Sequence, residues 1–216
     1  MPLLETTPLP PPLDRLFDGR AFGHDAPAGI AENPACERIV FATPSFMRSF
    51  HLVLQAEKPG AWSSACARAG TATGRKIATG LDTELARLGE PALAALPLET
   101  SLAYIERYFS SHGWGRLQLD LSDAPEHGIV IGRLQQSYFV AALHDVDDFT
   151  DPLLAGILQG FFEHVSGQEL GCIEIACARR GDPHCTFVIT APERLASIAP
   201  LLGSASAETI IDKLKA

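Results

Sequence analysis

The sequence lacks a long apolar run and any segment typical of a secretion signal. No stretch approaches the roughly 18 consecutive apolar residues that would span a bilayer. The amino-terminal stretch MPLLETTPLPPPLDRLF has neither the basic start nor the apolar centre of a signal peptide. We therefore expect a cytoplasmic protein without a membrane span.

Positive charge is also scarce. The chain has 17 lysines and arginines against 26 aspartates and glutamates, and a formal net charge of -9. This surplus of negative charge disfavours nucleic acids and anionic membrane surfaces as partners. The remaining composition, 46% hydrophobic and 20% charged, is typical of a globular protein with a sizeable core.

Motifs of the common enzyme classes are absent as well. The sequence has no Gly-x-Ser-x-Gly elbow, no dinucleotide-binding fingerprint and no nucleophile with a base at recognisable spacing. Gly70 and Gly74 precede Arg75 and Lys76, but a phosphate-binding loop needs a preceding strand and a Gly-Lys-Ser/Thr end. These absences lower the expectation of an enzyme and leave catalytic activity open.

Cysteine is present in an odd number, which disfavours a framework of disulfides in a chain of this size and expected compartment. The three cysteines near the carboxyl end are better candidates for metal ligation, and the other two for packing. The five are Cys36, Cys66, Cys172, Cys177 and Cys185.

Three regions differ in composition. Residues 1–43 form a proline-rich arm and docking segment, because five of the 16 prolines fall in the first 13 residues and glycine and proline stay frequent afterwards. We expect little regular structure there. Residues 44–190 carry the periodic patterns of a folded domain. Residues 191–216 predict a tail of one or two short helices, the last of which starts at Ser206.

Helical patterns fill the first half of the predicted domain, over 44–57, 61–89 and 98–113. The helix 61–89 is rich in small residues, and Gly70 and Gly74 would allow a close backbone contact with a neighbour. Such a face is one candidate for dimer formation. The last of these helices predicts a buried stripe of Leu98, Leu102, Ile105 and Phe109.

Strand patterns dominate the second half. Leu117, Leu119 and Leu121 alternate with polar residues, and 127–135 and, less clearly, 137–145 predict further strands. A helix over 152–167 follows, with Pro152 in its first turn. Two strands then flank a turn over 179–184. This order predicts an α+β fold with helices on one side of a mostly antiparallel sheet.

The final hairpin also carries candidate metal ligands. Glu174, Cys177 and Cys185 supply three zinc-type donors if the turn folds the second strand back on the first. Positions 174 and 177 face opposite ways in an ideal strand, so both reach one metal only through a bulge or a turn. Cys172 and His184 are alternatives in the same segment. A plain hairpin with buried thiols is the competing interpretation.

A family resemblance bears on this choice. The segment from Glu174 to Phe187 reads Glu-x-x-Cys-x7-Cys-x-Phe and resembles the signature of the 4-vinyl reductase domain family. The preceding residues 151–170 resemble the helix that comes before the signature, with Gly156 and Gly160 at its paired glycines. The family includes a bacteriochlorophyll-biosynthesis protein and sensor modules of aromatic-responsive activators, and it is related to subunits of a vesicle-tethering complex.

In zinc-bearing sensor members, the resemblance implies ligands at Glu174, Cys177 and Cys185 and a fourth, cysteine ligand at position 151. This chain has Asp151 instead, and a carboxylate also ligates zinc. The resemblance thus implies a closed, structural zinc site that pins the hairpin to the helix start. A site without metal remains the alternative. Replacement candidates for the fourth ligand are His144, Cys172 and His184.

A second resemblance rests on Gly113-Trp114-Gly115 before an alternating strand, together with the helix 152–167. These features are similar to the D subunit of bacterial cellulose synthase, an oligomeric accessory protein. It implies an assembly subunit of a synthase complex in place of a ligand-binding domain.

The favoured hypothesis is a non-catalytic sensor or carrier domain for an apolar, aromatic or tetrapyrrole-like molecule, as the first resemblance implies. A reductase is a third hypothesis, which no cofactor motif supports. We expect a dimer or higher oligomer. A pocket between helices and sheet is the expected ligand site. Its candidate walls are Phe46, Phe50, Ile105, Phe109, Trp114, Phe139 and Phe161.

Overall fold

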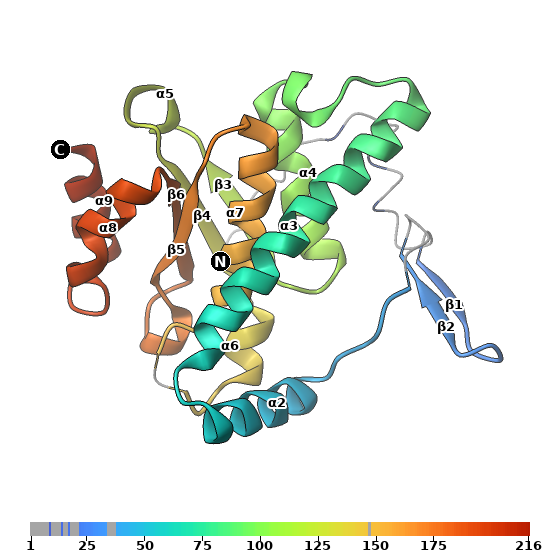
Figure 1. Cartoon of the computed structure of the whole chain (residues 1–216), viewed down its shortest axis with the longest axis horizontal. Coiled ribbons are helices and arrows are strands. Elements are labelled where there is room, and N and C mark those ends of the chain that lie inside the picture. The colour runs from blue at the N-terminus through green and yellow to red at the C-terminus, as the bar shows by residue number, and fades with distance from the viewer. Residues whose placement is uncertain (1–8, 10–13, 15–16, 18–21, 34–37, 147) are drawn as a thin grey trace.

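A computed structural model describes residues 9, 14, 17, 22–33, 38–146 and 148–216 of the chain. A four-stranded antiparallel sheet lies between two groups of helices (Figure 1). Its strands are β3 (Arg116–Asp120), β4 (Val130–Gln135), β5 (Gly171–Ala176) and β6 (Cys185–Thr190), in the spatial order β3-β4-β6-β5. The predicted α+β class is confirmed.

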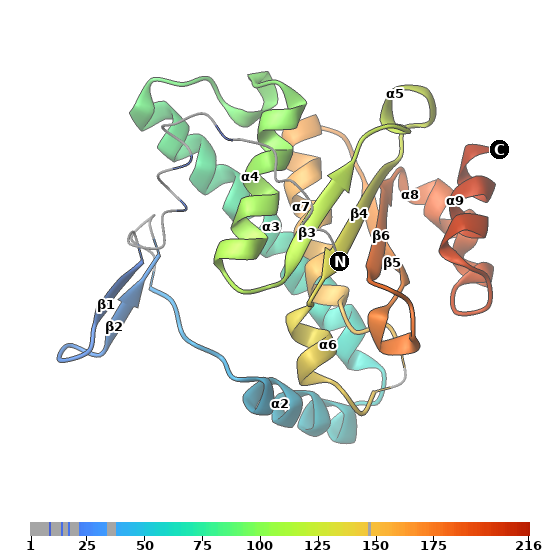
Figure 2. The same cartoon turned by 180° about the vertical axis from the view of Figure 1, so that it is seen from behind.

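Three helices lie on one side of this sheet, as expected from the sequence; two of them contact its strands, and the longest packs on one of these two. They are α3 (Ala61–Leu88), α4 (Leu98–Ser111) and α7 (Pro152–Ser166), and they bury the main core (Figure 2). The leucines at 117, 119 and 121 point into this core, so the predicted alternation is confirmed. Leu98, predicted to be buried, is 38% exposed because it lies at the open first turn of α4.

The two tail helices cover the other face, which the sequence did not indicate. Helices α8 (Pro192–Ile198) and α9 (Ala207–Lys215) pack a second, smaller core against β5 and its neighbours. Ser206 caps α9 by accepting a hydrogen bond from the amide of Thr209 at 3.3 Å, so the predicted start is confirmed. Helices therefore flank the sheet on both sides.

The small-residue face of α3 packs against α7 of the same chain. A side chain at Gly70 or Gly74 would meet the backbone of α7, and one at Gly156 or Gly160 would meet the backbone of α3. The predicted close approach is confirmed, and its partner is internal. This face is therefore unavailable as the dimer contact that the sequence suggested.

Residues 137–145 correct a prediction, because they form a short helix, α6 (Tyr138–Ala142), where a strand was expected. Gln136 has a φ of 54°, which turns the chain out of β4. The hydroxyl of Ser137 then accepts hydrogen bonds from the amides of Phe139 and Val140, and so caps the new helix.

The amino-terminal region also departs from expectation. Strands β1 (Gly23–Asp25) and β2 (Ile30–Glu32) form a hairpin where little regular structure was predicted. An extended segment joins it to α2 (Pro44–Glu57), which lies along the end of α3 (Figure 1). Most of the proline-rich arm is outside the described residues, but Leu9 is buried and Phe17 packs edge-on against Tyr104.

The remaining short elements connect these layers. They are α5 (Ala124–His127) and the 3-10 turns η3 (Leu93–Ala95), η4 (Ala178–Arg180) and η5 (Ala199–Leu201). Within the described part of the chain, none of the helices combines the length and apolarity needed to cross a membrane.

Candidate metal centre and aromatic cluster

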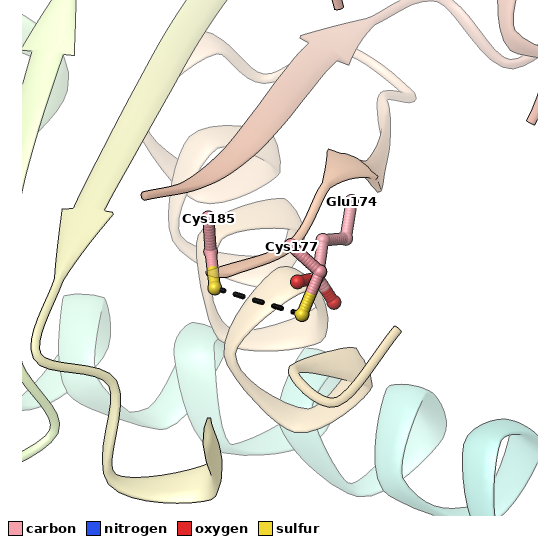
Figure 3. Close-up of side chains that lie close together, drawn as sticks. All are labelled: Glu174, Cys177 and Cys185. Carbon is pink, nitrogen blue, oxygen red and sulfur yellow. Dashed lines mark hydrogen bonds between the residues drawn. The ribbon is translucent and has the colours of Figure 1, made fainter. Parts of the chain in front are cut away.

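The β5–β6 hairpin brings three ligand-type side chains together. Potential ligand atoms of Glu174, Cys177 and Cys185 all lie within 4.8 Å of one another, and all three residues are buried (Figure 3). The two Sγ atoms are 3.9 Å apart, with the Cys185 thiol directed at Cys177. We call these three residues the Glu/Cys cluster.

A β-bulge and a turn overcome the strand geometry that separates positions 174 and 177. The register between β5 and β6 shifts between Glu174 and Ala176. Cys177 then lies at the start of η4, where its amide donates a hydrogen bond to Asp182 at 2.9 Å. The hairpin therefore contains both the bulge and the turn that can bring positions 174 and 177 together.

Asp151 borders the Glu/Cys cluster from the start of α7. Its amide donates a hydrogen bond to Oε2 of Glu174 at 2.9 Å, and its Oδ1 accepts one from Ser137 at 2.5 Å. Thr150 adds a contact of 3.4 Å between its hydroxyl and the sulfur of Cys177. Each of these hydrogen-bonding partners is neutral, so none of them offsets the acidic groups gathered here.

Burial and crowding shift the titration of these groups. Burial raises the pKa of Asp151 to about 6. Burial also raises the pKa of Glu174 well above its usual value, and the negative charges of Asp151 and Cys177 add to this effect. The hydrogen bond from Cys185 lowers the pKa of Cys177 to about 5, and the same bond together with burial raises the pKa of Cys185. The cluster thus favours one thiolate and disfavours further negative charge unless a cation balances it.

The donor set fits zinc. Among the described residues, Oδ2 of Asp151 and Oε1 of Glu174 are buried oxygens without a hydrogen-bond partner. Glu174, Cys177 and Cys185 supply three zinc-type donors. Asp151 borders them but lies outside the group of ligand atoms within 4.8 Å of one another, so it is a candidate for the fourth donor of a tetrahedral zinc site. Uncompensated buried carboxylates are costly, so these oxygens are suited to a bound cation.

The other proposed ligands lie elsewhere. His144 is exposed, whereas Cys172 and His184 are half-buried and are not part of the Glu/Cys cluster. Cys66 packs at the edge of the core, and burial raises the pKa of its thiol to about 11, as befits a packing cysteine. Cys36 is outside the described residues.

The predicted pocket walls divide into two groups. Ile105, Phe109, Phe139 and Phe161 are buried in the main core, and Trp114 is half-buried against it. Phe46 and Phe50 are instead 61% and 53% exposed on α2. The structure therefore does not gather all seven residues around one site.

Four of the aromatic rings form a continuous row from α2 into the core. The ring centroids of Phe50 and Trp62 are 6.0 Å apart, and those of Trp62 and Phe139 are 6.4 Å apart. Trp114 then stacks on Phe139 at 6.0 Å with an interplanar angle of 15°. We call Phe50, Trp62, Phe139 and Trp114 the aromatic row.

Two residues of this region were missed in the sequence. His51 and Trp62 are both buried, with ring centroids 5.0 Å apart. In the part of the chain that the structure describes, Nδ1 of His51 and Nε1 of Trp62 lack hydrogen-bond partners. The spacing of His51 from Met47 and Leu54 places it on the inner face of α2, which was a usable signal.

A surface hollow of about 440 Å³ lies between α3 and the end of α7. Its lining is polar and includes Arg75 and Glu163, which form an ion pair of 2.7 Å. It contains none of the predicted pocket residues, so it does not coincide with the aromatic row.

Comparisons with known proteins agree with the resemblance seen in the sequence. Residues 133–191 match the family model of the 4-vinyl reductase domain, a span that includes Asp151 and the whole Glu/Cys cluster. A search of curated protein sequences finds no match to this chain.

Several solved structures are similar in fold. The phenol-responsive sensory domain of the transcription activator PoxR, crystallised with phenol, has 17% identity and a TM-score of 0.65, covering 87% of this chain and 94% of that one. A vinyl-4-reductase family protein from Methanocaldococcus jannaschii has 15% identity and a TM-score of 0.46, covering 70% and 83%. A trafficking protein particle complex subunit 3 from Naegleria fowleri, covalently bound to palmitic acid, has 13% identity and a TM-score of 0.47, covering 68% and 93%.

The last two structures are too distant to add to the argument, whereas the first covers nearly all of both chains. The chain therefore has the fold of that sensory domain and, over residues 133–191, the pattern of the 4-vinyl reductase domain.

Proposed function

We propose that this chain is a non-catalytic domain that binds a small apolar or aromatic molecule and contains a structural zinc site. The match to the 4-vinyl reductase domain and the fold of a phenol-responsive sensory domain support the binding role. A sensor or carrier of this kind acts through a partner. We place it in the cytoplasm, in keeping with the expectation from the sequence.

Zinc would be held by Glu174, Cys177, Cys185 and Asp151. Four protein donors leave no open position, so the metal would supply structural cross-linking and no catalytic water. It would join the end of β5 and the start of β6 to the first turn of α7. The single observation that carries this assignment is a pair of buried carboxylate oxygens, without a hydrogen-bond partner among the described residues, beside two close thiols.

The ligand site would lie along the aromatic row. The indole Nε1 of Trp62 is a donor and a neutral His51 Nδ1 is an acceptor, so together they suit one hydroxyl group on an aromatic ring. Burial lowers the pKa of His51, which favours the neutral ring. The alternatives for the ligand, an apolar chain or a tetrapyrrole, would need more room than a single ring.

Calorimetric titration of the full chain with phenol and with protoporphyrin IX tests this proposal. Binding of phenol that is lost in Trp62→Phe is the expected result, because phenylalanine keeps the ring and removes the donor. Trp114→Phe is the matched control and should retain binding. A wild-type chain that binds neither compound, or equal binding by Trp62→Phe, would overturn this assignment of the site.

A second candidate is an assembly subunit, such as the cellulose synthase accessory protein. One observation favours an assembly role: α2 presents Phe46, Phe50, Leu52 and Val53 to solvent, following exposed Val40 and Phe41. A contiguous apolar surface of this kind is typical of protein contacts. We propose that it contributes to a homodimer or higher oligomer, which is compatible with the binding role.

A further inference from the structure

One side chain, Ser137, joins the candidate zinc site to the aromatic row. Its hydroxyl donates a hydrogen bond to Oδ1 of Asp151 at 2.5 Å. The same hydroxyl accepts hydrogen bonds from the amides of Phe139 at 3.1 Å and Val140 at 3.3 Å, and so holds the start of α6. Ser137 is 4% exposed, so water competes little for these bonds.

Helix α6 in turn positions the aromatic row. Phe139 lies between Trp62 and Trp114, and its ring packs against both indoles. Tyr138 packs edge-on against Trp114, and its hydroxyl donates to the carbonyl oxygens of Ala42 and Thr43 just before α2. A shift at the start of α6 would therefore move Phe139 and change its packing against Trp62 and Trp114.

The aspartate at position 151 makes this link chemically possible. A carboxylate has two oxygens: Oδ1 holds Ser137, and Oδ2 remains for a cation. A cysteine at this position would have a single sulfur and would have to use it for the metal. This chain thus has at position 151 a side chain that can ligate and hold a neighbour simultaneously.

We propose that Asp151 and Ser137 couple zinc binding to the position of α6, and thereby to ligand binding at the aromatic row. This inference rests on the proposed function, since it regulates the same site. Zinc at Oδ2 fixes the Asp151 carboxylate, which fixes Ser137 and the cap of α6. Coupling between sites is reciprocal, so the ligand strengthens zinc binding by the factor by which zinc strengthens ligand binding, about 5-fold or more.

Tryptophan fluorescence reads this coupling directly. The chain has 2 tryptophans, and both contact Phe139. Zinc has a filled d shell and no redox chemistry, so an emission change on zinc addition reports a structural response. The experiment titrates zinc chloride into the metal-free full chain and records bound zinc and emission on the same sample.

The expected result is a saturating emission change at one zinc per wild-type chain. Ser137→Ala should bind one zinc with that change lost, and Ser137→Thr, which keeps the hydroxyl, should restore it. Asp151→Cys is a second variant that keeps four ligands and should bind zinc silently.

Two results would overturn the coupling. One is that the wild type binds zinc but the coupling is not seen: its emission does not change, or Ser137→Ala and Asp151→Cys show the same change as the wild type. The metal site would then stand without the coupling. The other is a wild type that binds no zinc, which would overturn the metal site and the coupling together. Stoichiometry separates these two failures.

Discussion

The backbone amide of Asp151 donates a hydrogen bond of 2.9 Å to Oε2 of Glu174, across 23 residues of chain. It fixes the first turn of α7 to the end of β5 without any metal. It also takes up one oxygen of Glu174 and leaves Oε1 facing the buried cluster. Within one carboxylate, the arrangement therefore separates the oxygen of a structural hydrogen bond from the oxygen proposed to bind the metal.

Glu174→Gln tests this separation. Glutamine still accepts the Asp151 amide bond but loses the charge, so we expect zinc affinity to fall at least about 10-fold, on the scale of other changes to metal shells. Stability of the metal-free protein should change little. Competition with a chromophoric chelator measures the affinity. Glu169→Gln, on an exposed side chain, is the control, and equal affinities in the two variants would argue against Glu174 as a ligand.

Gly74→Ala tests the packing of α3 on α7. The new Cβ would overlap the carbonyl oxygen of Ile157 and lie 2.9 Å from the amide nitrogen of Phe161. Because backbone atoms cannot move aside singly, we expect a loss of roughly 1–3 kcal/mol in the free energy of unfolding, measured with urea.

Gly80→Ala is the matched control on the same helix. Its Cβ would meet nothing within 4 Å among the described residues, so alanine's helix propensity should stabilise the protein by up to about 1 kcal/mol. Equal effects of the two substitutions would contradict the close contact between the helices.

Glu106 lies outside the candidate site, and its burial predicts that the stability of the protein depends on pH. It is buried on α4 and accepts a hydrogen bond from the amide of Leu119, and burial raises its pKa above the usual 4.5. Because the pKa of this carboxyl is higher in the folded than in the unfolded state, its protonation stabilises the fold. This contribution is complete at a pH below the unfolded-state pKa and is lost as the pH rises through the folded-state pKa. Glutamine keeps the acceptor and has no charge to bury.

We therefore expect Glu106→Gln to be more stable than the wild type at pH 8, with the difference closing as pH falls below 4.5. Urea unfolding over this range measures it. Glu99→Gln, on the exposed start of α4, controls for the loss of one negative charge. A difference between Glu106→Gln and the wild type that does not vary with pH would refute the assignment.

The exposed apolar face of α2 predicts self-association. Phe46→Glu and Phe50→Glu place charges on that face, so we expect a smaller species than the wild type at equal concentration, measured by light scattering after gel filtration. The folded domain should survive, since Phe46 and Phe50 are mostly exposed. A wild-type protein that is monomeric at high concentration would contradict self-association through α2.

Some features of the molecule could be predicted from local sequence pattern. The alternation from Leu117 to Leu121 indicates a strand whose leucines all face the core, and Pro152 with Gly167 marks both ends of α7. Gly70 and Gly74 indicate a close contact because only glycine allows it. These signals are local, so a single sequence contains them.

Other features depend on long-range contacts that no local pattern encodes. Residues 137–142 have strand-forming composition, yet the turn at Gln136 and the cap by Ser137 make them a helix. The second helical layer could not be predicted, because the sequence does not indicate that Ile198 and Ile210 pack against the far side of the sheet. The proximity of Asp151 to Glu174 likewise depends on the bulge in β5, which no local pattern indicates.

The most direct test of a zinc-clasped domain is native mass spectrometry of the full chain after zinc loading, with the denatured mass as reference. The account predicts one zinc per chain in the wild type and in Cys66→Ser, and none in Cys177→Ala, whose fold is checked by circular dichroism. A wild type that stays metal-free after loading, with the Cys177 and Cys185 thiols both open to alkylation, would contradict the account.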